Sequence, residues 1–290
     1  MKLLLDTDIG SDIDDAVCLA YLLAQPRCEL LGITTVTGQA VERAELASVL
    51  VKVAGQDIPI YPGVEEPLLV SQRQPEAQQA RALIRWPHRT DFPKGEAIEF
   101  LRRTIRAHPG EITLLTIGPL TNIALLFSVD PEIPRLLQEL VLMCGIFTDT
   151  IPGAGPLEWN AMLDPHASAI VYRAPVPKLR SIGLDVTLKV TMPAAEVRQR
   201  FNHPRLTPVL DFAEVWFNQA DKITFHDPLA ATTIFNQEIV TFEPGRITID
   251  LDKEPGRTLW RPGVVGSSQS VGLNVNAAKF FEEYFGVFKA

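Results

Sequence analysis

The sequence has few cysteines, no surplus of basic residues and no long apolar run, and each shortage excludes a class of protein. Its three cysteines stand far apart at positions 18, 28 and 144, and no pair has the spacing of a redox motif or a zinc site. We therefore expect no disulfide framework and a reducing, cytoplasmic location. Residues 3–5 are too short for a signal-peptide core, and no run approaches the roughly 18 apolar residues of a membrane span. The sequence thus predicts a soluble protein with no membrane partner.

Acidic residues outnumber basic ones, with 35 Asp and Glu against 27 Lys and Arg, which gives a net charge of −8. No basic stripe offsets this surplus, so we expect no nucleic-acid partner and favour a small-molecule ligand. The composition, 46% hydrophobic and 21% charged, is that of a folded protein with a sizeable core. Because no linker, repeat or low-complexity tract divides the 290 residues, we predict a single domain over residues 1–290.

Short apolar runs alternate with helical patterns along the first half of the chain. Residues 2–5 form an apolar run that ends in acids, and residues 14–24 carry apolar side chains at helical spacing until Pro26. The same patterns predict further strands at 28–36, 58–61, 112–118 and 139–145, and helices at 41–54, 95–107 and after Pro119. This alternation predicts an α/β fold, with an open, mostly parallel sheet covered by helices on both faces.

Two stretches interrupt this alternation and are predicted to be loops. Residues 71–94 are rich in Gln, Arg and Pro, and residues 147–157 are rich in Gly and Pro. Loops this long in a compact domain are often lids over a functional site. Towards the carboxyl end, residues 194–220 have a helical pattern with Pro193 at its start, and residues 246–260 favour an antiparallel strand pair.

Five aspartates fall within ten residues of the first predicted strand, in the string DTDIGSDIDDA: Asp6, Asp8, Asp12, Asp14 and Asp15. They follow a strand of a parallel sheet, and ligands bind at the carboxyl ends of such strands. Capping of the next helix accounts for one or two of these acids. The electrostatic repulsion among five carboxylates is most simply offset by a hard divalent cation such as Ca²⁺ or Mg²⁺. The sequence therefore predicts a metal site here.

Two other families with acidic loops fit less well. An EF-hand counted from Asp6 needs glycine at its sixth position and glutamate at its twelfth, but the sequence has Ser11 and Val17 there. A phosphatase of the haloacid dehalogenase type also begins with a strand and a DxD motif, in which Asp6 would be the nucleophile. That type has Thr or Val where this chain has Gly10. A metal-dependent phosphatase is kept as the less favoured alternative.

Three further segments carry candidate site residues. His226 and Asp227 precede a helical run, Glu158 and Asn160 end the Gly/Pro-rich loop, and Ile117 stands where a strand turns into a helix and can offer its carbonyl to a cation. Taken singly, these segments have ordinary explanations: a helix cap, a solvated loop end and a turn. Their chemistry becomes informative only in combination, because together they offer acids, an amide, a carbonyl and an imidazole.

In this order along the chain, the segments resemble the nucleoside hydrolase family, of the inosine-uridine preferring type. The resemblance rests on eight fragments: DTDIGSDIDDA at 6–16, LLGITTVTG at 30–38, GVEEPL at 63–68, IGPLTNIA at 117–124, LVLMCG at 140–145, EWNAMLDPHA at 158–167, GLDVT at 183–187 and HDP at 226–228. It implies the Rossmann-like nucleoside hydrolase fold and calcium-dependent hydrolysis of the N-glycosidic bond of ribonucleosides. It also implies a homodimer or homotetramer, and it leaves purine or pyrimidine preference open.

The resemblance also implies roles for individual residues. The Ca²⁺ ligands would be the carboxylates of Asp8, Asp15 and Asp227 and the main-chain carbonyl of Ile117. Asp8 would be the base that accepts a proton from the attacking water, and His226 would be the acid or hydrogen-bond donor to the leaving nucleobase. The substrate would be held by Asp14, Gln39, Glu158, Asn160 and Asp227.

The chain departs from the family pattern at three places. Ile9 replaces a proline, and two extra residues separate Asp8 from the Asp14–Asp15 pair, so Asp14 is an alternative base and Asp12 an additional ribose contact. Gln39 stands where the family has Asn, and no HGxxG motif occurs between residues 70 and 95. These departures motivate a second hypothesis, a metal-dependent nucleoside or ribose binder that has lost hydrolysis.

His88, in the predicted loop 71–94, is a candidate to close over the nucleobase of the substrate. Trp159 and Trp260, elsewhere in the chain, are candidates to stack on the nucleobase.

Overall fold

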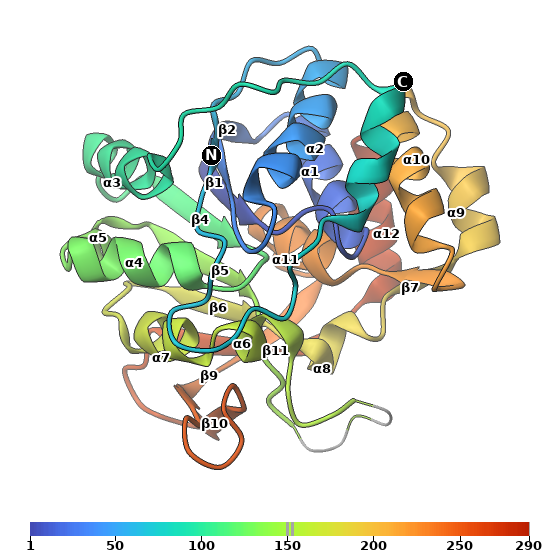
Figure 1. The fold of residues 1–290 in the computed structure, drawn as a ribbon. Helices are drawn as coiled ribbons and strands as arrows, with labels where there is room; N and C mark the ends of the chain where they lie inside the picture. Colours follow the sequence, from blue (N-terminus) through green and yellow to red (C-terminus); the bar gives the residue numbers. More distant parts are fainter. Residues whose placement is uncertain (149–150, 152–153, 290) are drawn as a thin grey trace.

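A nine-stranded sheet runs through the computed structural model of the chain, which describes residues 1–148, 151 and 154–289 (Figure 1). The strand order is β10-β9-β11-β6-β5-β4-β1-β2-β3. The strands are β1 (Lys2–Thr7), β2 (Glu29–Thr35), β3 (Ile60–Pro62), β4 (Ile112–Thr116), β5 (Glu139–Met143), β6 (Leu179–Ile182), β9 (Val240–Ile249), β10 (Thr258–Pro262) and β11 (Gln269–Val275). A small antiparallel sheet pairs β7 (Thr191–Pro193) with β8 (Lys222–Thr224).

Helices cover both faces of the large sheet, as the alternating pattern predicted (Figure 1). Along β1, Leu3 and Leu5 belong to one buried apolar cluster and Leu4 to the other, because successive strand side chains point to opposite faces. The first cluster includes α1 (Asp14–Ala24), α2 (Ala40–Val53), α10 (Thr207–Trp216), α11 (His226–Phe235) and α12 (Ala277–Gly286). The second includes α3 (Ala97–Ala107), α4 (Thr121–Val129), α5 (Ile133–Leu136) and α7 (Pro165–Arg173). The predicted α/β class with a mostly parallel sheet is confirmed.

The remaining helices are short and lie in the connections. They are α6 (Trp159–Leu163), α8 (Leu184–Thr187), α9 (Ala194–Arg200) and the 3₁₀ helices η1 (Gln78–Arg85) and η2 (Pro204–Leu206). The prediction that residues 71–94 are entirely loop is therefore wrong, because η1 forms within them and packs against α2 and α10. The predicted helical stretch 194–220 is divided into α9, η2 and α10, with a break where Pro204 has no amide hydrogen to continue the helix.

The carboxyl-terminal strand pair is confirmed, although β9 begins earlier than predicted, at Val240, and β10 extends to Pro262. The strands β6 and β11 and the helix α12 were not predicted. In the described part of residues 147–157 there is no helix or strand, as expected, and Pro152 and Gly153 lie outside the described residues. All three cysteines are free. Within the described ranges, no helix combines the length and apolar character needed to cross a bilayer.

The position of β1 in the sheet determines where a ligand can bind. β1 pairs in parallel with β2 on one side and with β4 on the other, so the connections that follow β1 and β4 diverge at their carboxyl ends. Such a switch in strand order opens a crevice in α/β sheets, and this crevice is the usual ligand site. The aspartate-rich loop follows β1 directly, and Ile117 follows β4.

Candidate functional site

A pocket of about 610 Å³ opens at this crevice, a volume typical of small-molecule sites. Nine residues were predicted for the site, and eight of them line the pocket: Asp8, Asp14, Asp15, Ile117, Glu158, Asn160, His226 and Asp227. The ninth, Gln39, does not line it. Asp12, Trp159, Trp216 and several residues of the 71–94 segment also line it. The sequence therefore located the pocket, and the structure supplies the contacts within it.

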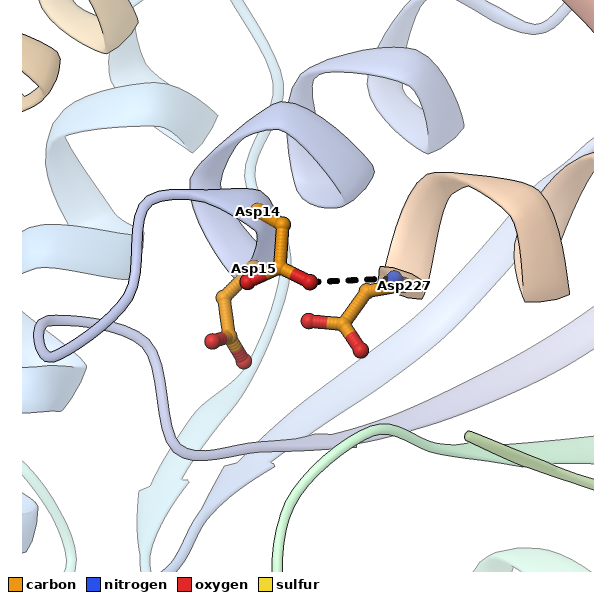
Figure 2. Close-up of side chains that lie close together, drawn as sticks. All are labelled: Asp14, Asp15 and Asp227. Carbon is orange, nitrogen blue, oxygen red and sulfur yellow. Dashed lines mark hydrogen bonds between the residues drawn. The ribbon is translucent and has the colours of Figure 1, made fainter. Parts of the chain in front are cut away.

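Three carboxylates meet at the base of the pocket (Figure 2). Asp14 and Asp15 begin α1, Asp227 lies in the first turn of α11, and one oxygen from each lies within 4.8 Å of the others. The two helices pack against each other, which brings positions 213 residues apart into contact. The amide of Asp227 donates to Asp14 Oδ2 at 3.1 Å, and the Thr7 hydroxyl donates to Asp15 Oδ1 at 2.5 Å. The prediction that Asp227 joins the amino-terminal acids is confirmed.

The electrostatics of this cluster favour a cation. Burial raises the pKa of Asp14, Asp15 and Asp227 well above the usual value, and the negative charge of neighbouring carboxylates raises it further. A divalent cation among these oxygens would offset both effects, and oxygen-only ligands suit Ca²⁺ or Mg²⁺. The residues present therefore fit a metal ion. The three-carboxylate group contains Asp14 rather than Asp8, which the resemblance had placed among the ligands.

Asp8 also lines the pocket, and both of its carboxylate oxygens have close neighbours. Its Oδ2 accepts a hydrogen bond from Gln74 Nε2 at 2.5 Å. Its Oδ1 packs against Gly118, where an added Cβ would approach it to 2.8 Å. The carbonyl of Ile117, one residue earlier, faces Asn160 and accepts from its Nδ2 at 3.0 Å. Asp8, the base predicted from the resemblance, therefore packs on the residue that follows Ile117, the predicted carbonyl ligand.

Glu158 combines a structural and a site role. Its carboxylate caps α6 and accepts hydrogen bonds from the amides of Gly145, Asn160 and Ala161 at 2.8–3.0 Å. Burial raises the pKa of Glu158, and these three amides oppose that rise. The Cys144 thiol is a further hydrogen-bond partner of this carboxylate, which also lines the pocket. The structure therefore shows the helix cap, and the sugar contact stays a prediction.

His226 lies at the start of α11 and contacts Thr187, whose hydroxyl oxygen is 2.7 Å from Nδ1. Burial lowers the pKa of His226 to about 4, so the ring is neutral near pH 7. When the Thr187 hydroxyl donates to Nδ1, the ring proton is on Nε2, which can then donate to a ligand. Of the two roles predicted for His226, the structure favours the hydrogen-bond donor over the acid.

Several predicted residues lie elsewhere. Gln39 is the residue before α2, and its Oε1 accepts from the amide of Ala77 at 2.7 Å, so its ribose contact stays a prediction. Asp6 is fully buried, accepts from Thr34 and Asn122, and does not line the pocket, which removes the nucleophile of the phosphatase alternative. His88 and Trp260 also lie outside the pocket lining, whereas Trp159 lines it.

The sequence interpretation missed Arg43, whose side chain holds the backbone of the acidic loop through hydrogen bonds. Its fully buried guanidinium donates to the carbonyls of Asp8, Ile9, Gly38 and Glu76 and to the Ser11 hydroxyl. Burial lowers the pKa of Arg43. Burial raises the pKa of Asp8, and the positive charge of Arg43 opposes that rise. A signal was present in the sequence, because Arg43 shares the helical face of Ala40, Ala44 and Ala47, where a charge is unexpected.

Replacing Arg43 tests its contribution to stability. Arg43→Met leaves four carbonyls without this donor and removes the buried positive charge beside Asp8. We expect the free energy of unfolding to fall by about 3–5 kcal/mol in urea titrations. Arg103→Met is the matched control, because its side chain is 60% exposed and ion-paired to Glu99 only at 4.0 Å, so its effect should stay within about 0.5 kcal/mol. Equal stability of the two variants would contradict the assignment.

Comparisons with known proteins find similar chains and a similar fold. A family model described as inosine-uridine preferring nucleoside hydrolase matches residues 3–282. The chain is 29% identical to the pyrimidine-specific ribonucleoside hydrolase RihA of Salmonella typhi, over 83% of this chain and 81% of that protein. It is 27% identical to a probable uridine nucleosidase 1 of rice, over 86% and 81%. The structure of a purine-preferring ribonucleoside hydrolase from Gardnerella vaginalis shares the fold, with a TM-score of 0.87, 24% identity, and 99% and 98% of the two chains covered.

Proposed function

Because the chain belongs to the inosine-uridine preferring nucleoside hydrolase family and is a hydrolase acting on nucleosides, we propose that it cleaves ribonucleosides to ribose and free nucleobase in a calcium-dependent reaction. The observation that carries the proposal is the meeting of Asp14, Asp15 and Asp227 at the base of a pocket that also contains Asp8. Acids arranged in this way suit a reaction in which a sugar ring gains positive charge.

The proposed Ca²⁺ ligands are Asp8, Asp15, Asp227 and the carbonyl of Ile117, with Asp14 beside them. A divalent cation held there supplies positive charge that offsets the acids, fixes sugar hydroxyls and increases the acidity of a nearby water. The buried, mutually repelling carboxylates support this proposal, because their raised pKa values show the cost of holding them together as anions.

In the proposed reaction, Asp8 accepts a proton from the attacking water. The water oxygen forms a bond to C1′ of the ribose while the bond from C1′ to the base nitrogen breaks and its electron pair leaves with the base. The departing base takes up a proton from solvent, and Asp8 returns its proton to solvent. Asp14 holds the 2′ hydroxyl, and Glu158 and Asn160 hold the 5′ and 3′ sides of the sugar. Glu158 and Asn160 line the same pocket as Asp8 and Asp14, which supports their part in this arrangement.

At the other end of the glycosidic bond, the neutral ring of His226 donates a hydrogen bond to the departing nucleobase. Trp159, 49% exposed, and Trp216 present aromatic surface to the same pocket. Aromatic rings offer a flat apolar surface against which a nucleobase can stack. The sugar end and the base end of the substrate are thus served by different residues.

A nucleoside panel tests the proposed function. Purine and pyrimidine ribonucleosides are incubated with the protein, with and without a calcium chelator, and free ribose and free base are measured. We expect ribose release from at least one nucleoside, loss of release with the chelator, and recovery when Ca²⁺ is added in excess. Calorimetric binding of a nucleoside without ribose release would support the impaired binder instead. Phosphate release from nucleotides without base release would support a phosphatase.

We also propose a homodimer or homotetramer in the cytoplasm, which light scattering and cell fractionation would test. The family resemblance supports the first part, and three free cysteines suit a reducing compartment.

A further inference from the structure

The side chain of Gln74, within residues 71–94, contacts Asp8, the residue predicted to be the general base. Gln74 is 7% exposed and donates from Nε2 to Asp8 Oδ2 at 2.5 Å. On the opposite side of the same amide, Oε1 accepts a hydrogen bond from the indole Nε1 of Trp159, also at 2.5 Å. A single glutamine therefore connects an aromatic ring of the pocket to the carboxylate that is proposed to take the proton from water.

From these two contacts we infer that Gln74 is a positioning residue for the reaction: it holds Asp8 Oδ2 in place, and the indole of Trp159 holds Gln74. This inference rests on the proposed function, because it assigns Gln74 a role through Asp8 as the base. A carboxylate oxygen has two lone pairs, so Oδ2 can accept from Gln74 and still receive a proton from water. Gln74 thus removes the rotational freedom of Asp8 without consuming its basic position.

The two partners determine the orientation of the Gln74 amide. An indole N–H only donates, and an ionised carboxylate only accepts. The amide therefore satisfies both partners when its oxygen faces Trp159 and its nitrogen faces Asp8. The flipped amide would set two donors against each other and two acceptors against each other. Glutamate in this place would bring a second carboxylate against Asp8, and leucine would make neither bond, so glutamine is the side chain that fits.

The backbone around Gln74 is also fixed. Its amide donates to Gln72 Oε1 at 2.7 Å, and the next residue, Pro75, packs so closely on Gly38 that a Cβ there would lie 2.5 Å from the Pro75 carbonyl. Further along the segment, the amide of Gln79 donates to the carbonyl of Gly10 at 2.9 Å. The segment is therefore held at Pro75 by the loop after β2 and at Gln79 by the acidic loop, close to the point where Gln74 reaches Asp8.

Substitutions at both ends of this connection test the inference. Gln74→Leu removes both hydrogen bonds, and Trp159→Phe removes the indole donor while keeping an aromatic ring. Because residues that orient a reactive group contribute about 10–100-fold, we expect Gln74→Leu to lower kcat for ribose release by about that factor, with KM nearly unchanged. Trp159→Phe should lower kcat less, and the double variant should be no slower than Gln74→Leu, since Trp159 is inferred to act through Gln74.

Gln56→Leu is the matched control, because its Nε2 donates to one backbone carbonyl, that of Leu23, outside the pocket. We expect kcat of this variant to equal that of the wild type. A readout independent of activity is the indole N–H resonance of Trp159, identified by its loss in Trp159→Phe. Gln74→Leu should shift this resonance and leave those of the other three tryptophans unchanged.

The outcomes separate the inference from the proposed function. A wild type that releases ribose, together with a folded Gln74→Leu variant of unchanged kcat, overturns the positioning role. An equal and additive loss in the two single variants does the same, because it shows that Trp159 does not act through Gln74. A wild type that releases no ribose overturns the proposed function, and an unshifted indole resonance in Gln74→Leu then also overturns the contact from Gln74 to Trp159.

Discussion

Replacing Asp8 by asparagine is expected to abolish ribose release, whereas Asp14→Asn retains measurable turnover. Asparagine keeps the shape of the side chain but has no basic oxygen, and a positioned general base contributes about 10²–10⁴-fold. Asp8→Asn should therefore lower kcat by that factor. Asp14 is assigned to the 2′ hydroxyl, so its loss should mainly raise KM. Steady-state kinetics with the best nucleoside of the panel measure both constants.

The same experiment decides between the two candidate bases. Asp14 Oδ2 accepts a hydrogen bond from the backbone amide of Asp227, whereas Asp8 Oδ2 accepts one from the side-chain amide of Gln74. Asp8 is a proposed Ca²⁺ ligand and Asp14 a proposed sugar contact, so calorimetric titration with Ca²⁺ should show a larger loss of affinity for Asp8→Asn than for Asp14→Asn. Asp57→Asn, at an exposed position outside the pocket, should change neither kcat nor calcium affinity. If Asp14→Asn is the inactive variant and Asp8→Asn the active one, the base is Asp14.

Much of the fold could be predicted because its signals are local. A parallel strand buried on both faces is a continuous apolar run, and the helices between strands show a 3.6-residue period that Pro or Gly ends. The site followed from the same logic, since acids at the end of β1 must lie at the crevice of the sheet. The distant Asp227 was assigned from the resemblance, and the packing of α1 against α11 explains why it arrives there.

The missed residues act through contacts that no local pattern encodes. Arg43 is a charged residue in an otherwise ordinary helix, and its acceptors come from three separate segments of the chain. Gln74 lies in a stretch whose Gln, Arg and Pro content predicts a loop, yet tertiary contacts hold it against the pocket. The 3₁₀ helix η1 also depends on distant parts of the chain, because it packs against α2 and α10.

Calcium is expected to stabilise the protein, and more strongly at pH 8 than at pH 5. Burial raises the pKa of Asp12 to about 7 and raises that of Asp14, Asp15 and Asp227 well above the usual value, whereas in the unfolded chain an aspartate titrates near 4. Between about pH 4 and 7 the folded, metal-free protein therefore binds more protons than the unfolded chain. By linkage, the stability of the metal-free protein falls as pH rises through this window.

Ca²⁺ opposes this loss because it binds the ionised carboxylates and competes with their protons. At pH 8 and about 100 times the dissociation constant, binding adds about 2.7 kcal/mol, or about 4–5 °C in Tm for a chain of this size. The shift should shrink towards zero at pH 5, as measured by thermal melts with and without Ca²⁺. Asp227→Asn should lose the shift at both pH values, while Asp57→Asn keeps it. A shift that does not change with pH, or that persists in Asp227→Asn, would place the cation elsewhere, because protons and calcium would then not share these carboxylates.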